Sequence, residues 1–439
     1  MWEFFTEPEF QQKLDWMTAF VRDECEPLDL LFPRPGDPYD VQNKASRAIM
    51  APLREKVREQ GLWACHLGPE LGGQGFGQLK LALMNEILGR SAWAPTVFGT
   101  AAPDTGNAEI LALYGTEEQR ARYLRPLLEG NIVSTFSMTE PQGGSDPKEF
   151  VCKATRDGDA WVIEGEKWFS SHARYASFFI VMVVTDPDAK PYERMSMLIV
   201  PAETPGIEII RNVATMNERD DLDEGTEGYL RYNKVRVPLD AMLGAPGEGF
   251  KVAQARLGGG RVHHAMRVVG KCQRAFDMMC ERALSRRTQG KLLAEHQFVQ
   301  GFIADSAIQL QQFRLLVLQT AWIIDNQPPG ASQPGRAART HIAMCKVALA
   351  AVLHDVLQRA VQLHGSLGTT QETPLGPWWA YAPQLALADG PTEVHKAAVA
   401  KQLLRGYQPA PGLFPTEHIP TRRAAARARY AALLEEHGQ

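Results

Sequence analysis

The feature that most constrains the fold of this chain is a change of hydrophobic period that occurs twice along it. Up to about residue 130, apolar side chains recur three and four positions apart, as in the segment FQQKLDWMTAFVRDEC, which is typical of amphipathic helices. Short runs rich in Val, Ile and Phe follow, such as ASFFIVMVVT, separated by Pro, Gly and Asp. Helical spacing then returns. This order excludes a doubly wound nucleotide-binding fold, in which strands and helices alternate.

The three blocks predict an α+β protein with a tail. We expect an N-terminal helical domain over residues 1–130, a middle β domain over 131–247, a C-terminal helical bundle over 248–410 and a tail over 411–439. The tail is Pro-rich, with a short helix predicted over 421–437 that either docks on a partner subunit or lies loose. Long helices are predicted over 250–285, 296–325 and 338–364, with a loop over 327–335.

Two N-terminal helix starts are predicted from capping boxes, in which a Thr is followed three residues later by Glu or Gln. They are Thr6 with Glu9 and Thr116 with Gln119. Within the third block, Gly258 to Gly260 interrupt a helical pattern. Three glycines weaken a helix by roughly 1 kcal/mol each relative to Ala, so either a close approach of another group or a local break is expected there.

Composition excludes several classes of function. The net charge of −4 and the sequence pI near 6.3 give no electrostatic reason to expect a nucleic-acid partner. No run of about 18 apolar residues occurs, so no membrane span is expected. The N-terminus lacks a basic segment followed by an apolar one, which predicts a cytoplasmic protein. The six cysteines form no CxxC pair, so we expect reduced thiols and no metal site.

The most informative segment is Gln362–His395, where a helix leads into a Gly-rich turn and an acidic residue follows further on. Asp389 comes after the apolar run LALA and directly before Gly390. A partly buried carboxyl group has a raised pKa, which suits a general base. The alternative is that Asp389 caps the helix that begins at TEVHKAAVAKQLL, although Thr392 with Glu393 can fill much of that role.

Four further motifs carry polar, aromatic or basic residues, two of them in the β block and two in the second helical block. The turn FSMTEPQGGSDP (136–147) exposes backbone N–H groups and hydroxyls, and EKWFSSHARYAS (166–177) places a large aromatic on a strand. FKVAQARLGGGRVHHAMR (250–267) and RRTQGKLLAEHQ (286–297) bring arginines into the helical block. Each motif alone is also compatible with an ordinary turn, a core Trp or a solvated Arg pair.

In this order, the five motifs resemble those of the acyl-CoA dehydrogenase family, over about residues 40 to 405. The segment ADGPTEVH resembles the acyl-CoA dehydrogenase 10 and 11 type in particular. The resemblance implies the fold of that family, with an N-terminal helical domain, a middle β-barrel or sandwich domain and a C-terminal four-helix bundle. It also implies FAD as the cofactor.

The resemblance assigns candidate site residues by position. The flavin ring would be lined by Phe136, Met138, Thr139, Trp168 and Ser170, with Glu393 also facing FAD. The pyrophosphate turn would be Gln362, Gly365 and Ser366, the last of these standing where a second Gly is usual. Arg286, Thr288 and Gln297 would contact the FAD of another subunit, although Gln289 replaces the usual Phe. Substrate contacts are expected from Gly144, Ser145, Arg261 and Gly390.

The implied reaction is α,β-dehydrogenation of an acyl-CoA thioester to the trans-2-enoyl-CoA, as in fatty acid β-oxidation. Asp389 would take the α-proton while hydride leaves the β-carbon for flavin N5, and an electron-transferring flavoprotein would receive the electrons. Some family members carry the base immediately before the Arg that matches Arg261, but Gly260 cannot act as one. Because two motifs serve FAD across a subunit boundary in the family, a homodimer or homotetramer is expected.

Two other functions are compatible with the same motifs. One is a flavin oxidase on this fold, either an acyl-CoA oxidase or a nitroalkane oxidase, the latter also using an Asp base. The other is a relative that retains flavin without turnover and binds nucleic acid. The acidic net charge and the presence of Asp389, Arg261 and Thr139 argue against the second.

Overall fold

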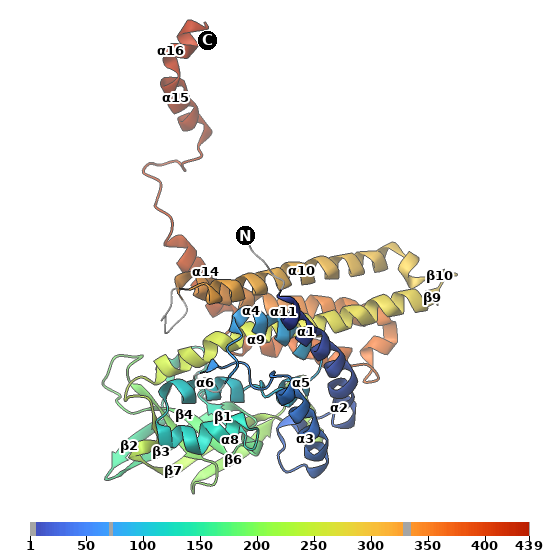
Figure 1. Ribbon diagram of the computed structural model, residues 1–439. Helices are drawn as coiled ribbons and strands as arrows, with labels where there is room; N and C mark the ends of the chain where they lie inside the picture. The colour runs from blue at the N-terminus through green and yellow to red at the C-terminus, as the bar shows by residue number, and fades with distance from the viewer. Residues whose placement is uncertain (1–5, 70–72, 328–334, 439) are drawn as a thin grey trace. The chain divides into compact units, whose positions relative to one another are not determined.

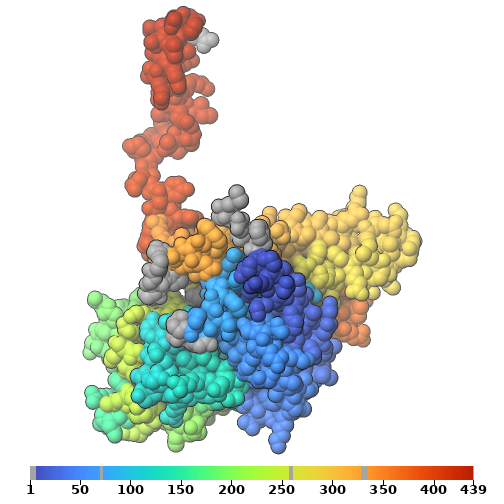
Figure 2. Space-filling model, in the orientation of Figure 1, coloured from blue at the N-terminus to red at the C-terminus, as the bar shows by residue number. Residues whose placement is uncertain are grey.

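The computed structural model describes residues 6–69, 73–327 and 335–438, and it confirms the order of helical, β and helical blocks (Figure 1). On the face shown in Figure 2, the N-terminal helices, in blue, lie against the β block, in cyan and green. The N-terminal helices are α1 Pro8–Phe20, α2 Glu26–Leu31, α3 Lys44–Glu59, α4 Gly77–Leu88, α5 Ala94–Val97, α6 Asp104–Tyr114, α7 Glu117–Gln119 and α8 Arg125–Leu128.

One of the two predicted capping boxes is confirmed. The Thr116 side chain accepts a hydrogen bond from the Gln119 backbone N–H at 3.2 Å, and the Gln119 side chain accepts one from the Thr116 N–H at 3.1 Å. The box at Thr6 is wrong: α1 is capped by Glu7, which makes no side-chain capping bond, and it begins at Pro8. Proline is favoured in the first helical turn because its missing N–H is not needed there, and here it fixes the start one residue later.

The middle block is an eight-stranded sheet in the order β6-β7-β3-β2-β4-β5-β8, with β1 pairing parallel to β4. The central strand β4 is buried along its whole length, because alternate side chains belong to different cores. Phe178, Ile180, Met182 and Val184 join a cluster with α6 and α8, whereas Phe179, Val181 and Val183 pack with β3 and β7. The strands are β1 Ser134–Ser137, β2 Lys153–Asp157, β3 Ala160–Ser171, β4 Phe178–Val184, β5 Met195–Pro201, β6 Ile207–Val213, β7 Glu227–Pro238 and β8 Met242–Leu243.

The third block contains the three long helices that the sequence predicts, with bounds that differ by no more than two residues. They are α9 Gly249–Ser285, α10 Gln297–Asp325 and α11 Arg336–His364. α9 continues through the three glycines, so the predicted alternative of a local break is wrong. The predicted loop over 327–335 lies almost entirely outside the described residues. Short elements follow or connect: β9 Arg287–Thr288, β10 Lys291–Leu292, α12 Leu375–Ala380, α13 Ala382–Leu387 and α14 Thr392–Leu404.

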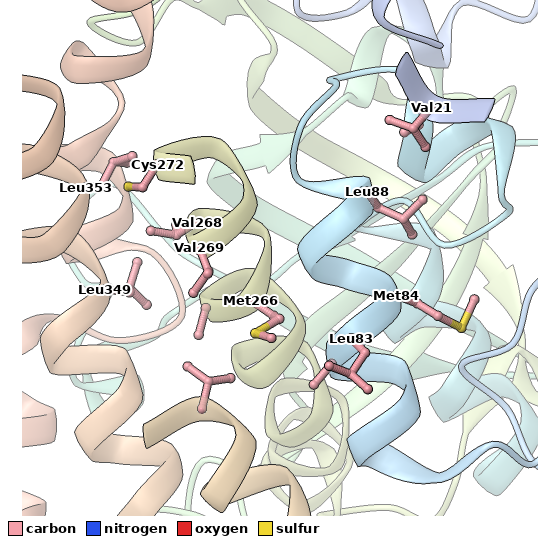
Figure 3. Packing of buried hydrophobic residues seen from close by; sticks show 14 of the residues in the cluster. Val21, Leu83, Met84, Leu88, Met266, Val268, Val269, Cys272, Leu349 and Leu353 are labelled. Carbon is pink, nitrogen blue, oxygen red and sulfur yellow. The ribbon is translucent and has the colours of Figure 1, made fainter. Parts of the chain in front are cut away.

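Helix α9 is the centre of the main hydrophobic core. Figure 3 shows its apolar side chains between α11 on one side and α4 of the N-terminal block on the other. The helical bundle is therefore completed by a helix from outside the C-terminal block. The labelled residues are Met266, Val268, Val269 and Cys272 of α9, Leu349 and Leu353 of α11, Leu83, Met84 and Leu88 of α4, and Val21.

One helical segment of the described residues, Arg336–Thr369, is long and apolar enough to cross a membrane, with a mean hydropathy of 1.4. However, 56% of its most apolar window is buried inside the protein, as in the core helix of a bundle. All six cysteines are free thiols. Residues 397–439 form a unit separate from residues 1–396, and this unit contains α15 Ile419–Arg429 and α16 Ala431–Glu436, which replace the single helix predicted over 421–437.

Candidate active site

The turn that follows β1 is held by a buried ion pair. The Lys167 ammonium lies 2.8 Å from Glu140 Oε1, and both side chains are at most 1% exposed. Lys167 also donates to the Met138 carbonyl at 2.8 Å, while Glu140 accepts from the backbone N–H groups of Val151 and Cys152 at 2.7 and 3.1 Å. Because the two charged side chains are buried and hydrogen-bonded to the backbone, they hold the backbone at Met138 and Thr139 in place.

Trp168 lies beside this turn on β3. Its backbone N–H donates to the Thr139 carbonyl at 2.8 Å, and its ring stacks on Tyr229 with centroids 5.1 Å apart. Its indole Nε1 is buried and has no hydrogen-bond partner among the described residues. Buried polar atoms are nearly always paired in native proteins, so this N–H is available to a bound ligand.

Ser170 occupies a different position from Trp168 because β3 has a bulge between them. The pairing of β3 with β7 shifts register between Lys167 and Ser170, and Phe169 adopts a left-handed φ of 52°. The Ser170 side chain is fully buried, and its hydroxyl lies 2.9 Å from that of Ser137. The Ser170 hydroxyl is therefore already paired with a protein group. It lies behind the β wall, the surface formed by Phe136, Thr139 and Trp168.

Phe136, at the start of the same wall, packs under Arg256 of α9. The guanidinium carbon lies 4.1 Å from the centroid of the Phe136 ring, a distance at which a cation is attracted to the ring face. Arg256 Nε donates to Asn107 Oδ1 at 2.9 Å. Burial lowers the pKa of Arg256, and the nearby carboxylates of Asp389 and Glu109 oppose that shift. Arg256 thus lies between the β wall and the candidate base.

Asp389 is half-buried, in the turn between α13 and α14, and has a left-handed φ of 56°. Its backbone carbonyl accepts from Arg261 Nε at 3.2 Å, from Arg261 Nη2 at 2.9 Å and from His395 Nε2 at 3.2 Å. Gly390 has a φ of 101°, and a Cβ there would lie 2.9 Å from His395 Nε2. Glycine is therefore required at 390 both for its backbone conformation and for space.

Other ionisable groups surround this turn. The Lys346 ammonium, whose residue is only 3% exposed, donates to the carbonyl of Leu385 near the end of α13. Burial lowers the pKa of Lys346 to about 8, although the Asp389 carboxylate opposes the shift. Burial likewise lowers the pKa of His264 to about 4, so its imidazole is neutral at neutral pH. The candidate base therefore faces one buried ammonium and a neutral imidazole.

A polar link joins the Asp389 segment to the β wall. Glu227, at the start of β7, accepts from the Ser171 hydroxyl at 2.8 Å and from Gln384 Nε2 of α13 at 3.5 Å. Burial raises the pKa of Glu227 to about 7. Ser171 follows Ser170 on β3, so this contact sets the position of α13 relative to the strand that carries Trp168.

The remaining predicted residues are exposed. Gly144 and Ser145 lie in the open part of the β1 turn, and Glu393 lies in the first turn of α14. Another group, Arg286 to Gln297, lies around the β9–β10 hairpin at the end of the α9–α10 pair that is remote from the sheet (Figure 1). Its exposed members are Arg286, Thr288 and Gln297, and the pyrophosphate turn Gln362, Gly365 and Ser366 is exposed as well.

The length of α9 keeps two of the predicted residue sets apart. Roughly 25 residues separate Arg261 from Arg286 along the chain, which corresponds to roughly 37 Å at about 1.5 Å per helical residue. α9 is a single helix of 37 residues over this stretch. One chain therefore links Phe136 to Asp389 through Arg256 and pairs Thr139 with Trp168, but it places Arg286 at the far end of α9.

Sequence reasoning did not identify four groups that shape the site: Arg256, Lys346, His395 and the Lys167–Glu140 pair. One of them left a signal, because Lys346 stands alone in the apolar run AMCKVALAAV. A lone charge on the apolar face of a core helix is usually paired, which marks it for attention. The other three became evident only from their partners in the structure.

The chain matches models of three domains of one family. They are the N-terminal domain of acyl-CoA dehydrogenase at residues 8–131, the middle domain at 135–222 and the C-terminal domain at 247–404. Acyl-CoA dehydrogenase family member 11 of Rattus norvegicus is 40% identical over 361 residues, covering 81% of this chain and 45% of that protein. Probable acyl-CoA dehydrogenase FadE2 of Mycobacterium tuberculosis is 40% identical over 359 residues, covering 80% of this chain and 85% of that protein.

A solved structure agrees with these matches. A putative acyl-CoA dehydrogenase from Mycobacterium abscessus has a TM-score of 0.83 and 37% identity, covering 92% of this chain and all of that one. The fold and these relatives define a flavoprotein oxidoreductase family, and the chain belongs to the acyl-CoA dehydrogenase family. It spans about half the length of the rat relative, 45%.

Proposed function

We propose that this protein is an FAD-dependent acyl-CoA dehydrogenase that converts an acyl-CoA thioester to the trans-2-enoyl-CoA. Family membership supports the class of reaction. The observation that carries the proposal is that Arg256 packs over the ring of Phe136, in the wall that also contains Thr139 and Trp168, and interacts electrostatically with Asp389. A carboxylate near an aromatic and polar wall suits removal of a proton beside a flat, redox-active group.

The residues present fit an FAD whose ring lies along this wall. Trp168 offers a buried N–H without a partner, and the turn at Thr139 is fixed in advance by Lys167 and Glu140. Phe136 and Met138 would contribute apolar contacts. Bound FAD would supply the hydride acceptor for the β-carbon of the acyl group.

The role of the protein is then to hold and remove a proton. Asp389 would take the α-proton of the acyl group, since its backbone is fixed by Arg261 and its side chain is partly shielded from water. The positive charges of Arg256 and Lys346 interact electrostatically with Asp389. Exclusion of water from the Trp168 side would strengthen these electrostatic effects.

The exposed set at the far end of α9 supports a homo-oligomer. Arg286, Thr288 and Gln297 lie too far from Trp168 to bind the same FAD within one chain, whereas a second copy could present them to it. Exposed guanidinium groups suit a pyrophosphate. The electron acceptor that we propose, as for the family, is an electron-transferring flavoprotein.

The test is reduction of the bound flavin by substrate. Purified protein reconstituted with FAD is mixed anaerobically with acyl-CoAs of graded chain length, and the absorbance near ~450 nm, typical of oxidised flavin, is followed in time. Bleaching is expected with at least one chain length, followed by slow reoxidation in air. Rapid reoxidation with peroxide formation would instead indicate an oxidase.

The base is tested by Asp389→Asn. Since Asn cannot accept the α-proton, the bleaching rate is expected to fall at least ~10³-fold, while FAD content and acyl-CoA binding remain. Wild-type bleaching by Asp389→Asn would show that another group is the base. Failure of every acyl-CoA to bleach the wild-type flavin would overturn the proposed activity.

A further inference from the structure

An aspartate that acts as the α-proton base poses a problem of reach. Its side chain is one methylene shorter than that of glutamate, a difference of about 1.5 Å. A short side chain cannot correct an error in the position of its own backbone by changing rotamer. Displacement of a reacting group by about 1 Å can cost on the order of 100-fold in rate, so the backbone at Asp389 has to be held firmly.

The carbonyl of Asp389 has an unusual number of donors. Arg261 contributes two N–H groups, at 3.2 and 2.9 Å, and His395 contributes one at 3.2 Å. Because a carbonyl oxygen only accepts, His395 must carry its proton on Nε2. Burial and the charge of Arg261 keep the pKa of His395 below its usual value, so the neutral Nε2–H form is the one that binds. The three donors saturate this oxygen.

A second anchor lies four residues earlier. The buried Lys346 of α11 donates to the carbonyl of Leu385, in the last turn of α13, where backbone carbonyls lack partners within the helix. A cation at the C-terminal end of a helix is also favoured by the helix dipole. Burying an ammonium group without a compensating partner is costly, and here its hydrogen bond goes to the backbone that leads to Asp389.

We propose that Lys346 and His395 are positioning residues that, together with Arg261, fix the segment Leu385–Gly390 so that the short Asp389 side chain reaches the α-carbon of the substrate. The three anchors come from α11, α14 and α9, so the segment is held from three directions. This inference rests on the proposed function for its role in the reaction, although the anchoring itself can be tested without it.

The anchors also alter the charge around the carboxylate. The ionisable groups that interact electrostatically with Asp389 come from every element packed against it: Arg256, Arg261 and His264 on α9, Lys346 on α11, Tyr381 before α13, and His395 on α14. Lys346 is charged below about pH 8.

The kinetic test uses Lys346→Met, which keeps an unbranched side chain one atom shorter but removes the donor and the charge, and His395→Phe, which keeps a ring. The bleaching rate at saturating acyl-CoA is expected to fall ~10- to 100-fold in each, with the half-saturating acyl-CoA concentration changed less than about threefold. Lys346→Arg, which keeps charge and donors, should recover part of the rate.

The control is Leu353→Ala, a buried position two turns along α11 that packs against α9 (Figure 3). It should lower thermal stability without lowering the bleaching rate at saturating acyl-CoA. Hydrogen–deuterium exchange provides a measurement independent of activity. Peptides covering 383–392 should exchange faster in Lys346→Met and His395→Phe than in the wild type, with no such local change in Leu353→Ala.

The outcomes separate the two proposals. If no acyl-CoA bleaches the wild-type flavin, the proposed function fails, yet faster exchange at 383–392 would still support the anchoring. If the wild type bleaches while Lys346→Met and His395→Phe retain its rate and its exchange, the positioning role is wrong. A loss of rate with exchange that rises equally across α11 and 383–392 would also overturn it, because general destabilisation would then account for the loss.

Discussion

At the scale of single residues, the candidate site is built from ionisable groups that burial has moved away from their ordinary pKa values. Burial raises the pKa of Glu227 to about 7 and lowers that of His264 to about 4 and that of Lys346 to about 8. Each shift favours the neutral form, which costs less to bury than a charge. Such clusters occur at functional sites more often than elsewhere; here His264 and Lys346 interact with Asp389, and Glu227 contacts α13 just before it.

Glu227 yields a prediction about stability and pH. Its pKa in the folded protein is about 7, above the ordinary value of 4.5, so its contribution to stability is full below pH 4.5 and is lost as the pH rises through 7. Glu227→Gln cannot ionise and should escape that loss. The variant is expected to exceed the wild type in free energy of unfolding by about 2–3 kcal/mol at pH 8.5.

Urea unfolding at pH 4.5 and at pH 8.5 measures the difference in free energy of unfolding between Glu227→Gln and the wild type. Near pH 4.5 the two proteins should differ little, because Glu227 is then neutral in the folded state and the Ser171 hydroxyl can bind either side chain. An equal difference at pH 4.5 and 8.5 would show that Glu227 is ionised in the folded protein throughout.

At the scale of elements, a buried ion pair joins the turn after β1 to strand β3. The Lys167–Glu140 pair is at most 1% exposed. Removal of one partner of a buried pair leaves an uncompensated charge and costs about 3–5 kcal/mol, whereas replacement of both can be nearly neutral. The pair therefore determines how rigid the turn at Thr139 is when a ligand binds to it.

Lys167→Met is accordingly expected to lower the free energy of unfolding by about 3–5 kcal/mol and to weaken FAD retention. The double variant with Glu140→Gln should recover much of the stability. Arg236→Ala is the matched control, since it removes an ion pair with Asp157 in the same sheet whose partners are 52% and 67% exposed. It should change stability by less than about 1 kcal/mol. Equal losses in Lys167→Met and Arg236→Ala would contradict a special role for burial.

At the scale of the whole molecule, two sets of candidate cofactor residues lie at opposite ends of α9. The set around Trp168 lies by the sheet, and the set around Arg286 lies at the β9–β10 hairpin (Figure 1). If FAD uses both, each site draws on two copies of the chain. A closed dimer of this kind contains two equivalent sites related by symmetry.

Complementation tests this arrangement. Trp168→Ala and Arg286→Ala homodimers should each lose most of their FAD, because every site in them carries one defect. A heterodimer of the two, isolated with two different tags, contains one intact site and one doubly altered site. It should retain about half of the wild-type FAD per subunit, as two-fold symmetry requires. A heterodimer as empty as both parents would rule out sites shared between subunits.

The sequence by itself determined the main helices and strands and drew attention to several candidate site residues. The spans of α9, α10 and α11 followed from helical period, since a long amphipathic pattern is a local property of the chain. The Thr116 capping box was readable for the same reason, whereas the one at Thr6 was displaced by Pro8. Family motifs drew attention to Asp389, Trp168 and Thr139 before any contact was known.

Only the tertiary structure decided how those residues are supported. Arg256 and Phe136, Lys346 and Leu385, and Lys167 and Glu140 are paired across long stretches of chain, and no local pattern encodes which charge meets which partner. The bulge in β3 turned Ser170 away from the side of Trp168. The length of α9 separates Arg286 from Asp389, because each helical residue adds a fixed rise along the axis. Which elements pack beside that helix depends on the whole fold.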